Sequence, residues 1–161
     1  MHDEARRFLE AVAGTLRRPR RVADVGGRNV NGTVRYLFPG AAWVGVDALP
    51  GPGVDVVADG ATWRPAEPFD VVLCTETLEH APDPGALARN LVALCRPGGA
   101  TLVTAASPER APHSAIDGGP LREGEPYRGV TAADLVDWLG GCRAVAIETR
   151  VPGDVYALAV K

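Results

Sequence analysis

The chain has 161 residues, of which 46% are hydrophobic and 23% charged, and its formal net charge at pH 7 is −3. A domain of this length buries about 70% of the surface that its unfolded chain exposes. The acidic balance argues against a nucleic-acid partner, and no run of 18 apolar residues is present to cross a membrane. Because no apolar signal region follows the Arg-rich N-terminus, we expect one cytoplasmic domain over residues 1–161.

Cysteine and lysine usage narrow the class of protein further. Cys74, Cys95 and Cys142 are odd in number, far apart and set in apolar runs. This pattern predicts reduced core thiols, with no disulfide and no metal site. Lys161 is the only lysine among 17 basic residues, which favours a bacterial, GC-rich coding sequence.

Apolar spacing in the first half of the chain predicts helices alternating with strands. Phe8, Leu9, Val12 and Leu16 share one face of a helix, and Pro39-Gly40 ends a second one. The elements expected in chain order are a helix over 3–17, a strand over 21–25, a helix over 32–38, and strands over 42–46, 54–58 and 69–74. The last of these strands is nearly all apolar, which is typical of a strand covered on both faces.

The second half continues the alternation and then changes it. Asp83-Pro84 is a typical helix start, and Thr131 with Asp134 forms an N-capping pair. Val151-Pro152-Gly153-Asp154 has the composition of a hairpin turn. The expected elements are a helix over 84–95, a strand over 100–105 after the turn at 96–99, a helix over 131–139, and strands over 143–149 and 154–160. We therefore expect a parallel sheet with helices on both faces, closed by an antiparallel pair.

A glycine-rich turn between the first two strands indicates a nucleoside site. Asp24 precedes Gly26-Gly27, and Asp47 ends the second strand. Turn glycines let backbone N–H groups approach a ligand, and a carboxylate at the second strand can accept both ribose hydroxyls. An NAD-type Rossmann domain shares these features, but it requires G-x-G-x-x-G, which this turn lacks.

Four segments together resemble class I S-adenosylmethionine-dependent methyltransferases, specifically the small type 11 methyltransferase domains. They are Val22 to Gly32, Asp47, residues 69–80 (FDVVLCTETLEH) and residues 94–99 (LCRPGG). The resemblance covers nearly the whole chain after the first helix. It implies a Rossmann-like, doubly wound α/β sheet with strand order 3-2-1-4-5-7-6, strand 7 antiparallel and helices on both faces. It also implies S-adenosylmethionine as cofactor and S-adenosylhomocysteine as product.

The same resemblance implies which residues hold the cofactor. Asp24 would accept a hydrogen bond from the ammonium group, Asp47 would bind the ribose, and Asp59-Gly60 would meet the adenine edge. The rest of the expected cofactor set is Gly26, Gly27, Asn29, Gly32, Ala48, Thr75, Glu76 and His80.

Alternatives remain for part of the glycine turn. Asp24 could order the turn itself, and Asn29 or Asn31 could cap the loop. Arg28 and Val30 depart from the family pattern D-x-G-x-G-x-G, because they stand where two of its glycines fall. A β-carbon at these positions would narrow the methionine end of the pocket.

Catalytic candidates follow the fourth strand and lie in the long irregular segment 107–129. By the resemblance, His80 faces the cofactor cleft, where an imidazole can take a proton from an acceptor or hold its loop shut. His113 is a second candidate base and Tyr127 a candidate wall of the acceptor pocket. A segment this long and irregular is typical of a substrate lid. A base is not obligatory, since methyl transfer from a sulfonium depends mostly on placement.

Two function classes follow. The first is methyl transfer to an oxygen or nitrogen of a small-molecule acceptor by in-line displacement. The second is a catalytically silent subunit that binds the cofactor or serves as a scaffold, and acts with a partner protein; the unusual Arg28 and Val30 motivate it. In the first class, the acceptor pocket would be built from segment 107–129, the N-terminal helix or a second subunit of a homodimer.

Overall fold

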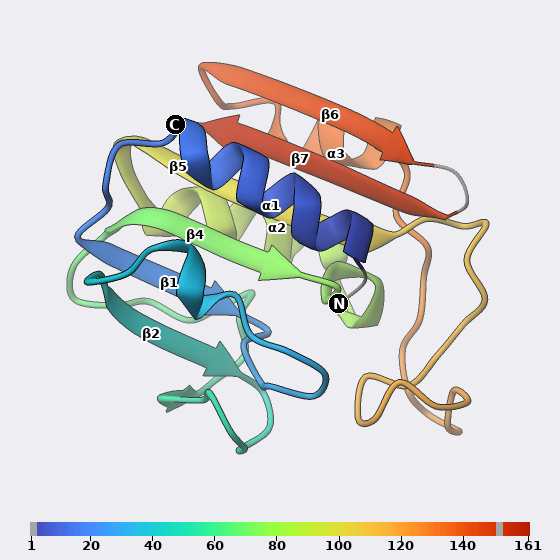
Figure 1. Cartoon of the computed structure of the whole chain (residues 1–161). Coiled ribbons are helices and arrows are strands. Elements are labelled where there is room, and N and C mark those ends of the chain that lie inside the picture. Colours follow the sequence, from blue (N-terminus) through green and yellow to red (C-terminus); the bar gives the residue numbers. More distant parts are fainter. Residues whose placement is uncertain (1–2, 151–152) are drawn as a thin grey trace.

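A seven-stranded sheet forms the centre of the molecule, with strand order β3-β2-β1-β4-β5-β7-β6 (Figure 1). The computed structural model describes residues 3–150 and 153–161. Its elements are α1 (Asp3–Thr15), β1 (Arg21–Val25), η1 (Arg35–Leu37), β2 (Ala42–Asp47), β3 (Val56–Val57), β4 (Phe69–Thr75), η2 (Leu78–His80), α2 (Pro84–Leu94), β5 (Cys95–Ala106), α3 (Ala132–Leu139), β6 (Ala144–Arg150) and β7 (Asp154–Val160). Strand β7 is antiparallel to both β5 and β6, whereas β1 to β5 pair in parallel. The expected topology is therefore confirmed.

The helices cover both faces of the sheet, as expected. Helix α1 lies in front of the sheet in the view of Figure 1, with α2 and α3 behind it. Successive residues of a strand point to opposite faces, and β4 divides its apolar side chains accordingly. Val71 and Leu73 pack in the core with Leu9 of α1, while Val72 and Cys74 pack in the core with Leu91 of α2. No helix in the described part of the chain is long and apolar enough to cross a membrane.

Both predicted helix starts are present. The Asp83 side chain accepts a hydrogen bond of 2.8 Å from the backbone N–H of Ala86, and Pro84 occupies the first turn of α2. Thr131 and Asp134 form a reciprocal capping box at the start of α3. The predicted turn residues Val151 and Pro152 lie outside the described residues.

The predicted helix over 32–38 is wrong. Only the three-residue 3-10 turn η1 forms there, and Gly32 has a φ of +124° instead of starting a helix. Between Gly32 and Pro39 too few residues remain to offset the cost of nucleating an α-helix. Val34 and Phe38 are nevertheless buried against the α1 side of the core, so the apolar pattern is satisfied without a helix.

Two strands differ from their predicted lengths. Strand β3 has only two residues, in place of the five expected over 54–58. Strand β5 begins five residues before the expected Ala100, because Cys95 pairs with Phe69 of β4; the residues of the predicted turn, 96–99, have no partner in the register and lie between this pair and the next one, Ala100 with Val71. The pairing shifts register between Phe69 and Val71, and Gly98 with a φ of 75° accommodates this irregularity.

Candidate functional site

A cavity of about 550 Å³ lies at the carboxyl ends of β1, β2 and β4. This is the edge at which open α/β sheets bind ligands. Of the residues expected to hold a cofactor, those that line it are Asp24, Gly26, Gly27, Gly32, Asp47, Ala48, Asp59, Gly60, Thr75, Glu76 and His80. His113 lines the cavity as well, whereas Asn29 and Tyr127 lie outside its lining.

The glycine turn lets the backbone come close to its neighbours, but the N–H groups of its two glycines are already hydrogen-bonded. The N–H groups of both Gly26 and Gly27 donate to the Val46 carbonyl, at 2.8 and 3.1 Å. They therefore tie the turn to β2 and are not available to a ligand, contrary to the sequence expectation. Gly26 has a φ of +79°, and a β-carbon there would lie 2.1 Å from Oγ1 of Thr77. Only glycine fits this position without displacing the loop after β4.

Asp24 presents a buried acceptor with no partner. The residue is 6% exposed, and Oδ1 has no hydrogen-bond partner among the described residues. Burial raises the pKa of this carboxyl from 3.8 to about 7; the nearby Arg35 opposes that effect and Asp47 adds to it. A buried acceptor without a partner is costly, so the site is suited to a ligand that brings a donor.

The carboxylate of Asp47 is fixed by two backbone groups. Oδ1 accepts from the N–H of Leu49 at 2.9 Å, and Oδ2 accepts from the N–H of Arg28 at 3.2 Å. Each oxygen can accept further hydrogen bonds, because an ionised carboxylate has about four acceptor sites. The residue is half-buried at the end of β2 and can meet two vicinal hydroxyls.

The turn after β3 also reaches the cavity. Oδ1 of Asp59 accepts from the N–H of Ala61 at 2.9 Å, and Oδ2 accepts from the hydroxyl of Thr62 at 3.1 Å. The Gly60 carbonyl accepts from the side-chain amide of Asn90 at 2.6 Å. These bonds fix the turn against α2 and hold Asp59 at the cavity edge.

Asn29 and Arg28 have roles in the loop that the sequence left open or missed. The Asn29 side-chain oxygen accepts from the N–H of Gly32 at 2.9 Å, so this residue caps the loop. The Arg28 guanidinium donates to the carbonyls of Ala115 and Ile116, at 2.9 and 3.3 Å. It thereby links the glycine turn to segment 107–129. No local pattern could reveal this contact, because its partners are backbone carbonyls almost 90 positions away.

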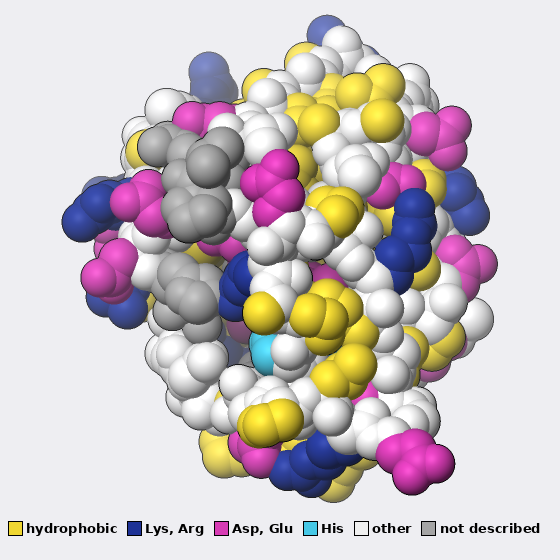
Figure 2. Space-filling view, turned by 90° about the vertical axis from the view of Figure 1, so that its right-hand side faces the viewer, with side chains coloured by type: hydrophobic (Ala, Val, Ile, Leu, Met, Phe, Trp, Pro, Cys, Tyr) yellow, Lys and Arg dark blue, Asp and Glu magenta, His cyan; other side chains and the backbone are white. Residues whose placement is uncertain are grey.

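Four side chains from η2 and segment 107–129 meet at the end of the cavity. The ring centres of His80 and His113 are 4.9 Å apart, and that of Tyr127 is 5.3 Å from each. Glu79 is fully buried beside them, and its Oε1 accepts from the N–H of Ala106 at 3.2 Å. Figure 2 shows a histidine surface in a hollow on this side of the molecule, between basic and apolar side chains.

The electrostatics of this cluster follow from its burial. Burial, with His113 nearby, lowers the pKa of His80 to about 4, so its imidazole is neutral at pH 7. Burial and the neighbouring Glu76 raise the pKa of Glu79 to about 8. Burial raises the pKa of Tyr127 to about 12, so its hydroxyl keeps its proton. An imidazole with so low a pKa is a weak general base.

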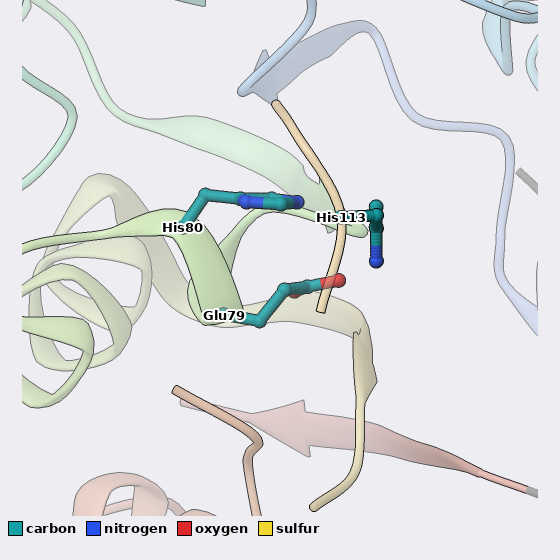
Figure 3. A group of neighbouring side chains, drawn as sticks. All are labelled: Glu79, His80 and His113. Carbon is teal, nitrogen blue, oxygen red and sulfur yellow. The ribbon is translucent and has the colours of Figure 1, made fainter. Parts of the chain in front are cut away.

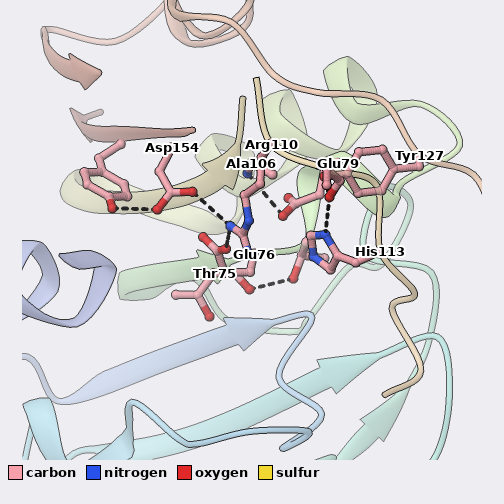
Figure 4. Close-up of polar contacts among 11 residues, drawn as sticks. Thr75, Glu76, Glu79, Ala106, Arg110, His113, Tyr127 and Asp154 are labelled. Carbon is pink, nitrogen blue, oxygen red and sulfur yellow. Dashed lines mark hydrogen bonds and ion pairs between the residues drawn. The ribbon is translucent and has the colours of Figure 1, made fainter. Parts of the chain in front are cut away.

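A second buried network stands next to this cluster (Figure 4). Arg110 pairs with Glu76 and, at 2.9 Å, with Asp154, whose other oxygen accepts from the Tyr156 hydroxyl at 3.0 Å. Glu76 has a φ of 50°, a left-handed conformation that non-glycine residues rarely adopt. The expected cofactor residue Glu76 is thus held by an ion pair to segment 107–129, which the sequence did not reveal.

Comparison with known proteins identifies the family of the chain. The family model described as a methyltransferase domain matches residues 1–138. The chain belongs to this family. Among curated relatives, a ubiquinone biosynthesis O-methyltransferase of Bordetella bronchiseptica is 49% identical over 43 residues, and one of Coxiella burnetii is 47% identical over 36. These matches cover 27% and 22% of this chain, and only 17% and 15% of those proteins.

Solved methyltransferase structures share the fold over nearly the whole chain. A Burkholderia thailandensis 1,6-didemethyltoxoflavin-N1-methyltransferase, with its substrate and S-adenosylhomocysteine bound, aligns at a TM-score of 0.67 and 20% identity. The alignment covers 99% of this chain and 77% of that one. The N-methyltransferase NodS of Bradyrhizobium japonicum, with S-adenosylhomocysteine bound, aligns at a TM-score of 0.68 and 15% identity, and the alignment covers 98% of this chain and 86% of that one. The sugar N-methyltransferase KedS8 of a Streptoalloteichus species aligns at a TM-score of 0.69 and 16% identity, and the alignment covers 97% of this chain and 86% of that one.

Proposed function

We propose that this chain is an S-adenosylmethionine-dependent methyltransferase that methylates an oxygen or nitrogen of a small molecule. The observation that carries the proposal is the pair of carboxylates in one cavity: Asp24 with its unmet acceptor, and Asp47 with its two oriented oxygens. One is suited to an ammonium group and the other to a ribose diol. When bound, S-adenosylmethionine supplies an electrophilic methyl group on a sulfonium.

The chain's own contribution is positioning. Asp24 would hold the methionine end, Asp47 the ribose, and Asp59-Gly60 the adenine edge. Thr75 and Glu76, at the end of β4, line the same cavity as these residues and as His80 and His113. Holding two reactants in line can contribute about 7–11 kcal/mol, so placement supplies most of the rate enhancement that this reaction needs.

The acceptor would bind against His80, His113 and Tyr127. Segment 107–129 would act as its lid, within a single methyltransferase domain. The contacts that support this role join the segment to the rest of the site: Arg28 to the Ala115 carbonyl, and the N–H of Arg128 to the Glu79 carbonyl at 2.8 Å. The relatives methylate oxygen in ubiquinone biosynthesis and nitrogen in a toxoflavin precursor or a sugar, which supports a small acceptor.

Calorimetric titration with S-adenosylmethionine and S-adenosylhomocysteine tests this function. We expect micromolar binding to the wild type and a loss of about 10-fold or more in Asp47→Ala, since a hydrogen bond to a charged group is worth about 1.5–3 kcal/mol. Asp137→Ala, at an exposed position of α3, is the matched control and should bind like the wild type. Folded wild type that binds neither compound would reject the proposal. It would favour a silent scaffolding subunit that needs a partner protein and no cofactor, with the Arg28 contact to segment 107–129 closing the pocket.

A further inference from the structure

Three metal-ligating side chains converge beside the cavity. They are Glu79 and His80 from η2 and His113 from segment 107–129, and Figure 3 shows them reaching toward one another. Each offers one ligand atom, and these atoms all lie within 4.8 Å of one another. A carboxylate with two imidazoles is a common ligand set for divalent transition metals.

Two of these groups lack partners. Oε2 of Glu79 and Nδ1 of His80 are both buried, and neither has a hydrogen-bond partner among the described residues. Leaving two such groups unsatisfied costs free energy. A cation between them would satisfy both once Glu79 has lost its proton, and the resulting fully buried carboxylate would balance the charge of the ion.

The surrounding contacts orient these ligands. Oε1 of Glu79 is engaged by the N–H of Ala106, which leaves Oε2 facing the cluster. Nδ1 of His113 lies 3.2 Å from the Ala111 carbonyl, so a proton on Nδ1 leaves Nε2 free as a ligand. Hydrogen bonds of this kind to the second atom of a ligand are typical of metal sites.

We propose that Glu79, His80 and His113 bind one divalent transition-metal ion of the zinc class. Two imidazole nitrogens favour such an ion over Mg²⁺, which prefers oxygen ligands. Adjacent ligands at bonds of about 2.1 Å lie about 3.0–3.4 Å apart, so small side-chain rotations would close the present spacing. Glu76 is not a ligand, because Arg110 already pairs with it. This departs from the expectation of no metal site.

Three protein ligands leave coordination positions open, and both histidines line the cavity. Metal binding itself is independent of the proposed function, but the role of the ion rests on it. An acceptor hydroxyl on the ion would have a lowered pKa and lose its proton to water. Its oxygen would then bond to the methyl carbon as the carbon–sulfur bond breaks, leaving a neutral thioether. The site therefore fits an acceptor that carries a hydroxyl group.

The test is a calorimetric titration of untagged, chelator-treated protein with Zn²⁺, and separately with Mg²⁺. We expect one Zn²⁺ per chain, bound more tightly than Mg²⁺. Glu79→Gln and His113→Ala should each weaken Zn²⁺ binding by more than about 100-fold, since even outer-shell partners are worth about 10–100-fold. Glu109→Gln, exposed on the same segment, is the matched control. The absorption spectrum of bound Co²⁺ should change in His113→Ala. Because His113 lies in a loop, this variant is less liable to misfold than one at the fully buried Glu79.

Each outcome is decisive. Wild type that binds no Zn²⁺ stoichiometrically, prefers Mg²⁺, or binds Zn²⁺ equally after both ligand substitutions would overturn the metal site. Titration of the same samples with S-adenosylmethionine separates the two proposals. Binding of Zn²⁺ without S-adenosylmethionine would reject the methyltransferase and keep the metal site. Binding of S-adenosylmethionine without Zn²⁺ would keep the methyltransferase and reject the metal site. The unpartnered polar atoms of Glu79 and His80 would then be features of a metal-free acceptor pocket.

Discussion

Arg28 and Ala115 join two walls of the cavity: the Arg28 guanidinium donates to the Ala115 carbonyl at 2.9 Å. The same guanidinium reaches the Ile116 carbonyl at 3.3 Å. The pattern D-x-G-x-G-x-G, which the glycine turn resembles, has glycine where Arg28 stands, so this tether is a departure from that pattern. The Arg28 side chain therefore ties segment 107–129 to the glycine turn. In the resembled pattern this position has no side chain that could do so.

Arg28→Ala should loosen segment 107–129. Both tethering bonds end on exposed carbonyls, so we expect a loss of global stability below about 1 kcal/mol. Local opening of the segment should rise more, and limited trypsin digestion should cut after Arg110 or Arg122 several times faster than in the wild type. Arg17→Ala, exposed after α1, is the control and should leave the digestion rate unchanged. Equal rates in Arg28→Ala and wild type would show that the tether does not hold the segment.

Asp24 should make stability depend on pH. Its pKa is about 7 in the folded protein and 3.8 as the reference value. A raised folded-state pKa contributes stability that is present at low pH and is lost as pH rises through the folded value. Asp24→Asn removes this loss. The free energy of unfolding of the variant, relative to that of the wild type, should therefore rise between about pH 4 and pH 7, by of order 2–4 kcal/mol in total. Urea unfolding of both proteins at several pH values measures it; a difference that is flat with pH would contradict the prediction.

The same carboxyl should control cofactor binding if the proposed function holds. An ammonium group pairs with the ionised form of Asp24, so binding of S-adenosylmethionine should strengthen by up to about 10-fold per pH unit between pH 5 and 7. Asp24→Asn should bind more weakly and lose this dependence. Calorimetric titrations across the pH range give the comparison. Wild-type affinity that is constant over these pH values would place the ammonium group elsewhere.

Local patterns in the sequence predicted most of the fold. Strand β1 and the capping pair Thr131 and Asp134 depend on neighbours in the chain, and the structure places both where the sequence predicted them. The helix over 32–38 failed because apolar spacing does not reveal that Gly32 takes a positive φ. Burial of Val34 and Phe38 satisfied the same pattern without helical backbone.

The site was less predictable, because its parts meet only in the folded chain. The residues at strand ends, such as Asp24 and Asp47, could be found because parallel strands end at one edge of a sheet. His80 and His113 were singled out separately, but their contact depends on the path of an irregular segment. The buried partner Glu79 stood next to His80 in the sequence, yet only its lack of exposure marks it as more than a loop acid.

Arg110 should be the most important ion-pairing residue for stability. Its side chain is 19% exposed, and those of its partners Glu76 and Asp154 are 11% and 10% exposed. Arg110→Ala would leave two largely buried carboxylates without their cation, at a cost of about 2–4 kcal/mol. Arg122→Ala breaks a half-exposed pair with Asp117 on the same segment and should cost less than about 1 kcal/mol. Urea unfolding measures the free energy of unfolding of both variants. Similar losses in the two would contradict the prediction that burial makes the Arg110 network more important for stability than the exposed pair.

Gly26 tests whether the turn needs glycine for its backbone or only for space. In Gly26→Ala the new β-carbon would lie 2.1 Å from Oγ1 and 2.7 Å from Cβ of Thr77, so rotating that side chain cannot relieve the clash. The φ of +79° adds strain, and together we expect a loss of about 2–4 kcal/mol. Gly14→Ala in α1 meets nothing within 4 Å and should gain up to about 1 kcal/mol. The double variant Gly26→Ala/Thr77→Gly removes the clash but keeps the strain, so full recovery of stability in it would show that φ contributes nothing.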